Sequence, residues 1–426
     1  MATHSESAKQ LINLYTGSKP FEDVLKDIAQ KQPGDIPPAV ELKDNPDDPE
    51  GSRLKRIQLL AQHSGVEIKQ LTSATVHQSP DNYRGNIENY IGITQIPTGL
   101  AGPFYINGTA AQGDFYIPLA TTEAALIASY SRGAKATRLC GGITSVCTTE
   151  GLQRSPLWKF ESLVEVGQFC QWFLLQLDTF KQVATQHSRH AQLKDVRLNM
   201  EGNNVLAVFE YTCGEAAGQN MATICTEAIC QYIIQQTPVT PICWFVESNY
   251  SGDKKATTLA LNSVRGKKVT TEALLTRDIV NNLLKTTPEA MATYWQSSMI
   301  SASQSGSIGL QGHIANGLTA LFLACGQDVA CVSEAYVGIT RMEVTRQGDL
   351  YVAVTLPSLV VGTIGGGTSL PTQSECLQIL GCQGEGSARK FAEICGALAL
   401  AGEVSIAAAL AAGHFSNAHQ QFRKKA

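Results

Sequence analysis

Charged side chains in two stretches of the chain could take part in proton transfer or charge stabilisation. Glu123 follows a threonine pair and precedes small residues at helical spacing, within the segment 118–145. Lys254 lies in an Asp-Lys-Lys turn, from Asp253 to Lys255, that follows a strand-like apolar stretch. A carboxyl group can donate a proton, and a fixed ammonium group can stabilise negative charge that develops on a substrate. Both stretches are therefore candidates for a catalytic site.

Structural roles also explain these residues when each stretch is taken alone. The hydroxyl of Thr121 or Thr122 could cap a helix by accepting a hydrogen bond from a free N–H of the first turn. Glu123 would then lie in that first turn, where the helix dipole favours a carboxylate. The charges at 253–255 equally fit a solvated cluster. The rest of the chain decides between these interpretations.

Two glycine-containing segments could bring the backbone close to an anion. A strand expected at 204–213 runs into a turn at Gly214 that opens a long helix, whose free N–H groups can bind a phosphate. The segment 360–371 contains three consecutive glycines, which also allow a close approach of backbone to phosphate. Neither segment contains the GxGxxG pattern, so a Rossmann fold is not indicated.

The composition excludes several classes of protein. A net charge of −4 over 426 residues does not suit a general binder of nucleic acid. We find no apolar run long enough for a membrane helix and no hydrophobic signal core at the N-terminus, so we expect a cytoplasmic protein. The twelve cysteines form no CxxC pair and are expected to be buried thiols in a reducing compartment. We expect no metal site.

Several elements can be expected from the sequence pattern. Residues 1–87 are polar and helix-forming at both ends, with a loop at 34–51. An amphipathic helix is expected over 160–183, and shorter helices over 276–284 and 288–295. A small-residue helix over 313–324 would place His313 and Asn316 on one face, with Asp328 just beyond its end. The last helix, at about 388–412, is rich in alanine.

An ordered set of motifs resembles the catalytic portion of 3-hydroxy-3-methylglutaryl-coenzyme A (HMG-CoA) reductases. The similarity covers about residues 88–419 and is closer to the eukaryotic and archaeal type than to the bacterial degradative type, without that group's membrane anchor. The motifs are ENYIG, PLATTEAALIAS, GEAAGQNM, NYSGDKK, GSIGLQGHIANGLTALFLACGQD, GTIGGGTSL and LAAGHFSNAH.

The resemblance implies the reduction of HMG-CoA to mevalonate and free coenzyme A with two NADPH, a reaction of isoprenoid and sterol biosynthesis. It assigns catalysis to Glu123, Lys254, Asp328 and His419. Lys254 would stabilise the charge that develops on the thioester oxygen, and Glu123 would supply the proton that makes the alcohol. Asp328 would hold both in one hydrogen-bonded unit. His419, rather than His414, would protonate the departing thiolate.

The resemblance also implies binding residues. The expected substrate contacts are Arg154, Asp253, Lys255, Gln296, His313 and Asn316. The expected NADPH contacts are Ser188, Arg189, Glu215, Gly218, Asn220, Gly365, Gly366, Gly367 and Thr368. An arginine at position 189 suits NADPH over NADH, because its guanidinium can pair with the 2′-phosphate.

Three positions depart from the family pattern. Glu215 stands where an aspartate is usual, and Glu247 replaces a small residue near the substrate carboxylate, which it would repel unless it turns away. Counting back from Asp328 places Gln296 where the family has a lysine, a change that would cost about 1–3 kcal/mol of binding to the carboxylate. These changes suggest a reductase that binds statins poorly. They also leave open a reductase of a different acyl-CoA or a non-catalytic paralogue.

The architecture implied by the resemblance is α+β. A helical N-terminal segment, 1–87, would precede a large HMG-CoA-binding domain made of 88–154 and 256–426. A small ferredoxin-like NADP(H)-binding domain, 155–246, would be inserted in it, and a connecting loop, 247–255, would carry the catalytic lysine. The family places its active site at a dimer interface, so we expect a dimer or a homotetramer.

Overall fold

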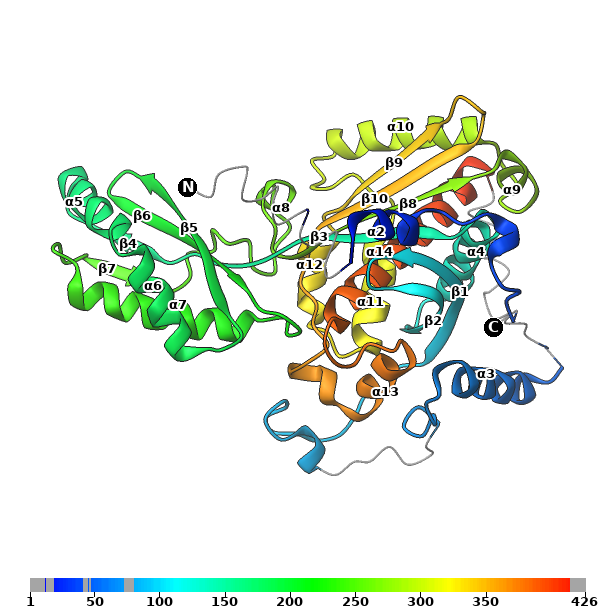
Figure 1. Cartoon of the computed structure of the whole chain (residues 1–426), viewed down its shortest axis with the longest axis horizontal. Coiled ribbons are helices and arrows are strands. Elements are labelled where there is room, and N and C mark those ends of the chain that lie inside the picture. Colours follow the sequence, from blue (N-terminus) through cyan, green and yellow to red (C-terminus); the bar gives the residue numbers. More distant parts are fainter. Residues whose placement is uncertain (1–11, 13–18, 41–44, 46, 73–79, 414–426) are drawn as a thin grey trace.

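The structure is a computed structural model that describes residues 12, 19–40, 45, 47–72 and 80–413. Its helices and strands form two lobes of unequal size that share one strand (Figure 1). The small lobe comprises residues 157–245, and the large lobe comprises most of the remaining described chain. This mixture of helices and sheet confirms the expected α+β class.

The shared strand is β3 (Ile143–Arg154), which enters both halves of one continuous sheet. The strand order is β7-β4-β6-β3-β8-β10-β9. The greater part of β3 pairs with β8, and its last three residues, Leu152 to Arg154, pair with β6 of the small lobe. The connection to the small lobe therefore begins at Arg154, at the end of a paired strand.

The small lobe follows the order β-α-α-β-β-α-β, and its strands are arranged β7-β4-β6-β5. This is the ferredoxin-like pattern with one helical connection split in two. Aromatic rings fill its core, including Trp158, Phe173, Phe180 and Phe209. The elements are β4 (Leu157–Lys159), α5 (Leu163–Leu174), α6 (Leu177–His187), β5 (Gln192–Glu201), β6 (Asn204–Thr212), α7 (Gln219–Gln236) and β7 (Cys243–Phe245).

The single helix expected over 160–183 is wrong, because the segment forms two helices. Ser162 caps α5 by accepting a hydrogen bond from the backbone N–H of Glu165. The chain then turns after Leu174, and α6 begins at Leu177. The turn lets Phe173 and Phe180 meet in the same core, with ring centroids 4.8 Å apart. Apolar residues continue at helical spacing across the turn, so the sequence pattern alone predicts a single helix.

The large lobe is built around α14 (Ser387–Ala411), a long apolar helix that packs against α4, α10, α11 and four strands of the sheet. It is long and apolar enough to cross a membrane, which the sequence interpretation overlooked, but 83% of its apolar window is buried in the fold. Its two buried carboxylates accept backbone hydrogen bonds: Glu393 from Ala110 and Ala111, and Glu403 from Gly312 and His313. Such satisfied carboxylates tie distant loops to the core.

The other elements of the large lobe complete the layers around α14. The helix expected at 288–295 extends to Gln304. Thr287 caps its start, and Met291 and Met299, eight residues apart, are both buried against the lobe, so the buried face continues past residue 295. The strands are β1 (Thr98–Gly108), β2 (Gln112–Ala120), β8 (Gly266–Leu275), β9 (Ile339–Val344) and β10 (Leu350–Leu359). The helices are α4 (Leu126–Leu139), α8 (Leu259–Asn262), α9 (Arg277–Asn282), α10 (Pro288–Gln304), α11 (Ile314–Ala324), η3 (Val329–Cys331), α12 (Val332–Ala335), η4 (Gly366–Ser369) and α13 (Pro371–Ile379).

The described N-terminal elements lie on the surface of the large lobe. The carboxylate of Glu375, which is buried in α13, accepts hydrogen bonds from the backbone N–H groups of Lys69, Gln70 and Leu71. This contact holds the segment that follows α3 against the lobe. The elements are α2 (Phe21–Ile28), η1 (Pro33–Asp35), α3 (Pro49–Ser64) and η2 (Pro80–Tyr83).

Candidate active site

Lys254 and Asp328 form an ion pair between two segments of the large lobe. Their Nζ and Oδ2 atoms lie 2.7 Å apart, and both side chains are nearly half exposed. Lys254 lies in the turn that follows β7 and has a φ of 54°, which is uncommon for a residue with a side chain. Asp328 follows α11 and caps η3. The hydrogen bond to Asp328 raises the pKa of the Lys254 ammonium above its usual value, so this cation stays charged at neutral pH.

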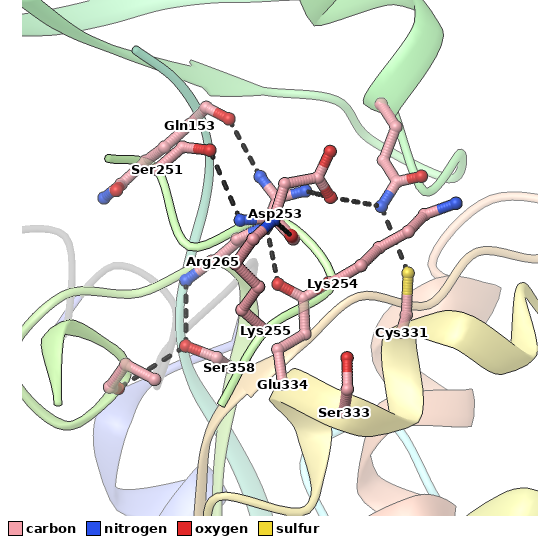
Figure 2. A network of polar contacts seen from close by, with 12 residues as sticks. Gln153, Ser251, Asp253, Lys254, Lys255, Arg265, Cys331, Ser333, Glu334 and Ser358 are labelled. Atoms are coloured by element: carbon pink, nitrogen blue, oxygen red, sulfur yellow. Dashed lines mark hydrogen bonds and ion pairs between the residues drawn. The ribbon is translucent and has the colours of Figure 1, made fainter. Parts of the chain in front are cut away.

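Asp253, the residue before Lys254, is bound by two buried arginines. Its Oδ2 accepts a hydrogen bond from Nη1 of Arg154 at 2.6 Å, and its Oδ1 accepts one from Nη2 of Arg265. Burial alone would raise the pKa of the Asp253 carboxyl, but the two guanidinium groups hold it below its usual value. Because both carboxylate oxygens are occupied, Asp253 fixes the turn that carries Lys254. Figure 2 shows Asp253 beside Arg265 in this turn.

Arg265 and Glu334 are members of this network that the sequence analysis missed. Nε of Arg265 donates to Oε2 of Glu334 at 2.6 Å, and its Nη1 donates to the backbone oxygen of Gln153 at 2.8 Å (Figure 2). Both side chains are almost fully buried. Burial raises the pKa of Glu334, and the charge of Arg265 opposes that rise. The signal that could have found Arg265 is the alternation of side chains along a strand. Arg265 lies just before β8 and two residues before the buried Lys267, so its side chain is expected on the same, buried side.

Glu123 does not lie in the first turn of a helix, and neither Thr121 nor Thr122 is an N-cap, so the structural alternative considered for this stretch is wrong. Helix α4 begins at Leu126, after Ala125 adopts a left-handed φ of 69° that ends any continuous helix with the preceding residues. The hydroxyl of Thr121 accepts a hydrogen bond from the backbone N–H of Glu123, in a turn before the helix. The exposed carboxylate of Glu123 accepts hydrogen bonds from Nδ2 of Asn316, 3.3 Å from each oxygen.

Glu123 lines a groove of about 1280 Å³ between the N-terminal segment and the large lobe. Within the described chain, no hydrogen bond or ion pair joins Glu123 to Lys254 or Asp328. Within one chain, the expected catalytic residues therefore form two separate groups: Glu123 is bound by Asn316, and Lys254 is paired with Asp328. The expectation that Asp328 holds both Lys254 and Glu123 in one unit is not met by the bonds seen here.

His313 and Asn316 do not share one helix face. His313 is the N-cap of α11 and has a non-helical backbone, and its Nδ1 lies 3.2 Å from the hydroxyl of the buried Tyr130. Asn316 lies in the first turn and faces Glu123. Glu403 fixes the start of this helix by accepting the N–H of His313. Asn316 is thus positioned toward the candidate site, and the ring of His313 packs against α4.

Two of the segments expected to bind the cofactor meet at the junction of the lobes. Ala216 pairs with Ile364 in an isolated parallel bridge, and the backbone N–H of Thr363 donates to the carbonyl oxygen of Glu215 at 2.8 Å. The α7 N-cap, Gly218, has a φ of 82° and carries no side-chain cap, so N–H groups of the first turn of α7 are open to a ligand. A Cβ at Gly218 would collide with the side chain of Cys213.

The triple-glycine segment also approaches the loop that carries Asp328. A Cβ at Gly326 would collide with the backbone of Gly367, so this contact requires glycine. Cβ atoms built at Gly365 and Gly366 would meet nothing within 4 Å, and these residues face open space. Thr368 turns inward and donates its hydroxyl hydrogen to the oxygen of Gly365 at 2.7 Å. An open backbone thus lies beside the end of α11.

The remaining expected cofactor residues differ in whether their side chains already have partners within the protein. Ser188 ends α6, and its hydroxyl lies 3.8 Å from the sulfur of Met221 in the first turn of α7. Arg189 and Asn220 are exposed, and no ion pair to Arg189 is seen within the described residues. The carboxylate of Glu215 accepts hydrogen bonds from the N–H groups of Gly386 and Ala388, each at 2.7 Å. Its longer side chain thus caps α14 of the large lobe.

The substrate positions that depart from the family pattern are also placed. Glu247 is turned toward Arg154, 3.6 Å away, and accepts hydrogen bonds from the backbone of Asn249 and the hydroxyl of Ser251. Its charge is therefore balanced within the protein. Gln296 is an exposed residue of α10. Lys255 is exposed and donates to the backbone oxygen of Asp253 at 3.0 Å. His419 and His414 lie outside the described residues.

The cysteines contribute no metal site within the part of the chain that the structure describes. No cluster of three or more metal-ligating side chains is present among those residues. Burial raises the pKa of Cys331 well above its usual value, although the thiol lies beside the site and its sulfur accepts a hydrogen bond from Gln219 at 3.1 Å. This thiol is therefore uncharged at neutral pH and serves packing rather than nucleophilic chemistry.

Comparisons with known proteins agree with this arrangement. The family model described as hydroxymethylglutaryl-coenzyme A reductase matches residues 52–424. The 3-hydroxy-3-methylglutaryl-coenzyme A reductase of Pyrococcus abyssi is 41% identical over 374 residues, which cover 86% of this chain and 91% of the relative. The enzyme of the same name from Methanocaldococcus jannaschii is 42% identical over 362 residues, 84% of this chain and 89% of the relative.

A solved structure supports the fold. The class II 3-hydroxy-3-methylglutaryl-CoA reductase of Streptococcus pneumoniae, bound to NADPH in open conformations, superposes with a TM-score of 0.67. The match covers 84% of this chain and 96% of that one, at 19% sequence identity, so it bears on the fold alone. The archaeal relatives and the family model confirm the resemblance drawn from the motifs. The chain therefore belongs to the hydroxymethylglutaryl-coenzyme A reductase family.

Proposed function

We propose that this protein reduces HMG-CoA to mevalonate and free coenzyme A, with two molecules of NADPH as the reductant. The observation that carries the proposal is the Lys254–Asp328 ion pair at the junction of the two lobes, in a chain of this family. The raised pKa of Lys254 keeps a fixed cation where a substrate oxygen could gain negative charge. Such preorganised charge is the largest single contribution to many enzymatic rates.

We assign the catalytic roles from the family motifs, supported by the contacts of the groups that the structure describes. Lys254 stabilises the negative charge on the substrate oxygen, and Asp328 holds Lys254 in place at 2.7 Å. Glu123, which lines the groove and is bound by Asn316, supplies the proton that forms the alcohol. We assign the protonation of the coenzyme A thiolate to His419 from the family motif, because an imidazole can exchange a proton near neutral pH.

The cofactor residues fit a phosphorylated dinucleotide. NADPH, when bound, supplies the two hydrides of the reaction. In the small lobe, domain 155–246 of our proposal, the open N-terminus of α7 and the exposed Arg189 offer hydrogen-bond donors to phosphate groups. Ser188 lies beside Met221 of the same turn, so both donor groups come from one region. The open backbone at Gly365 and Gly366 faces the same junction from the large lobe.

The residues expected to contact the substrate fall into two groups, those already bonded within the protein and those with exposed polar groups. Arg154 and Asp253 are occupied by each other and by neighbouring groups, so they shape the pocket. Lys255 and Asn316 keep exposed polar groups for HMG-CoA. Poor statin binding is a prediction that now rests on Gln296, because the charge of Glu247 is directed at Arg154.

The proposal includes a cytoplasmic dimer or homotetramer in which two chains complete each site. Glu123 lies in an open groove that the N-terminal segment and α13 also line, and in one chain it makes no bond to the Lys254–Asp328 pair within the described residues. A second copy that faces this groove could bring the two parts together. Sedimentation at micromolar concentration measures the assembly.

The test is oxidation of NADPH at 340 nm with HMG-CoA as substrate, with and without a statin. Wild-type protein should turn over and release coenzyme A, with two NADPH consumed per mevalonate. Turnover with another acyl-CoA but not HMG-CoA would favour the alternative substrate. The absence of turnover with any acyl-CoA, although NADPH binds, would favour a non-catalytic paralogue.

A further inference from the structure

Arg265 is a buried cation that touches both segments of the catalytic ion pair. Its side chain is 4% exposed and lies just before β8. It donates hydrogen bonds to Asp253, to Glu334 at 2.6 Å and to the backbone oxygen of Gln153 at 2.8 Å. All three of its nitrogens therefore have a partner inside the protein.

The two carboxylates that Arg265 contacts lie close in sequence to the catalytic pair. Asp253 immediately precedes Lys254, in the turn that ends with Lys255. Glu334 belongs to α12, which continues directly from η3, and the N-cap of η3 is Asp328. Arg265 thus connects the segment that carries the lysine to the segment that carries the aspartate (Figure 2).

The Lys254–Asp328 pair cannot set its own geometry. The side chains are 43% and 42% exposed, and an ion pair at that exposure contributes little to the order of a loop. The left-handed backbone of Lys254 adds a conformation that a lysine does not favour. Another group must therefore hold the turn in place.

We propose that Arg265, with Glu334 as its buried counter-ion, is the positioning residue that holds Lys254 against Asp328. This inference rests on the proposed reductase function, because it assigns Arg265 a part in that reaction. A planar guanidinium with several donors can bind two carboxylates and a carbonyl at fixed angles. A lysine has one nitrogen and cannot reproduce that geometry, so charge alone is insufficient at this position.

The network continues beyond Arg265 with alternating charge. Along it, Glu334, Arg265, Asp253, Arg154 and Glu247 follow one another. Each arginine lies between two carboxylates, and Asp253 lies between two arginines. This alternation keeps buried charges paired, which is the condition under which they are tolerated in a protein interior.

The experiment compares Arg265→Lys with a matched control, Arg138→Lys. Arg138 is also a buried arginine that binds a carboxylate, Asp114, and a backbone oxygen, that of Pro37. It lies on α4 and contacts none of the network residues. Both substitutions keep the charge and remove the guanidinium, so a general loss of packing affects both variants.

Three measurements are made on each full-length variant. Steady-state kinetics give kcat and the KM values for HMG-CoA and NADPH, and thermal unfolding reports stability. Acetic anhydride labelling at pH 9, read by mass spectrometry, gives the reactivity of Lys254 relative to the exposed Lys194 of β5. The labelling does not depend on turnover. Glu334→Gln, which keeps the side-chain shape, is measured in the same way in case Arg265→Lys fails to fold.

Arg265→Lys should lower kcat by about 10- to 100-fold, since a misplacement of about 1 Å can cost that much, with both KM values within about threefold. Lys254 should label faster, because a lysine released from Asp328 has a lower pKa. Glu334→Gln should change both quantities in the same direction. Equal kinetics and equal labelling for Arg265→Lys and Arg138→Lys, or for Glu334→Gln and wild type, would overturn the inference. A wild type without turnover would instead refute the proposed function, and the labelling would still test the positioning.

Discussion

Asp328→Asn separates the proposed catalytic role of the Lys254–Asp328 ion pair from its role in stability. Oδ2 of Asp328 accepts the bond from Lys254, and Oδ1 accepts a separate hydrogen bond from the backbone N–H of Ala330 at 3.1 Å. Asparagine has the same size and keeps an oxygen for the cap, and it is as good an N-cap as aspartate. The substitution therefore removes the negative charge and leaves the start of η3 intact.

The structure gives different magnitudes for the two effects. Because both side chains are more than two-fifths exposed, the pair contributes about 0–1 kcal/mol to the free energy of unfolding. A loss of that size lowers Tm by less than about 4 °C in a domain of this size. Loss of one preorganised electrostatic group costs about 2.7–4 kcal/mol of transition-state stabilisation, which lowers kcat by about 10²- to 10³-fold. Lys254 keeps its charge at neutral pH in the variant, since only the upward shift of its pKa is lost.

The assay is NADPH oxidation at 340 nm with saturating HMG-CoA, together with calorimetric unfolding. The control is Asp178→Asn, which breaks an exposed pair with Lys181 of 3.2 Å on α6 and should leave kcat unchanged. A variant Asp328→Asn that keeps more than about a tenth of wild-type kcat would refute the assigned role. A fall in Tm as large as the fall expected for a buried pair would show that the ion pair is mainly structural.

Three further predictions concern the small lobe and the buried network. Arg189→Ala should weaken NADPH binding by about 1–3 kcal/mol and leave NADH binding nearly unchanged, measured by fluorescence titration; an equal loss for both cofactors would contradict a 2′-phosphate contact. Gly218→Ala should destabilise the protein by about 1–3 kcal/mol, because its Cβ would meet Cys213 at a left-handed φ, whereas Gly167→Ala in the open interior of α5 should be neutral or stabilising in the same unfolding assay. Asp253 has a folded-state pKa below its ordinary 3.8, so its contribution to stability is present above that pH and is lost as pH falls through the lowered pKa. Asp253→Asn should therefore make the free energy of unfolding, measured by urea titration, depend less on pH below pH 4. An unchanged pH dependence in that acidic range would argue against the ion pairs of Asp253.

Much of the fold follows from the sequence, because repeated patterns and the family motifs determine it together. The ferredoxin-like order of the small lobe was expected from the family resemblance, and the long alanine-rich helix was expected from its composition. The split between α5 and α6 was missed, because apolar spacing continues across Leu175 and carries no breaker residue. Spacing shows which residues face a core and does not show where the chain turns to reach it.

The candidate site shows the same division. Lys254 and Asp328 are distant in sequence, and the family motifs predicted both residues and a bond between them, which the structure contains. The bond expected between Asp328 and Glu123 is absent from the described contacts, where Glu123 is bound by Asn316. The helix start near Glu123 was misplaced because a threonine pair resembles a cap, whereas Ala125 adopts a left-handed conformation that residue type does not announce. Local patterns therefore did not predict the geometry of the candidate site.

The treatment of Glu247 shows why a departure from a family pattern must be judged with its partners. By residue type alone, a carboxylate near the substrate carboxylate implies repulsion. In the structure Arg154 lies between Glu247 and Asp253, and Ser251 and the backbone of Asn249 satisfy the remaining oxygen positions. The added negative charge thus extends a chain of alternating charges that ends at Arg265 and Glu334. Because we infer that this chain of charges holds the turn of Lys254, we assign Glu247 to the framework of the proposed catalytic lysine, and its presence is no argument for a different acyl substrate.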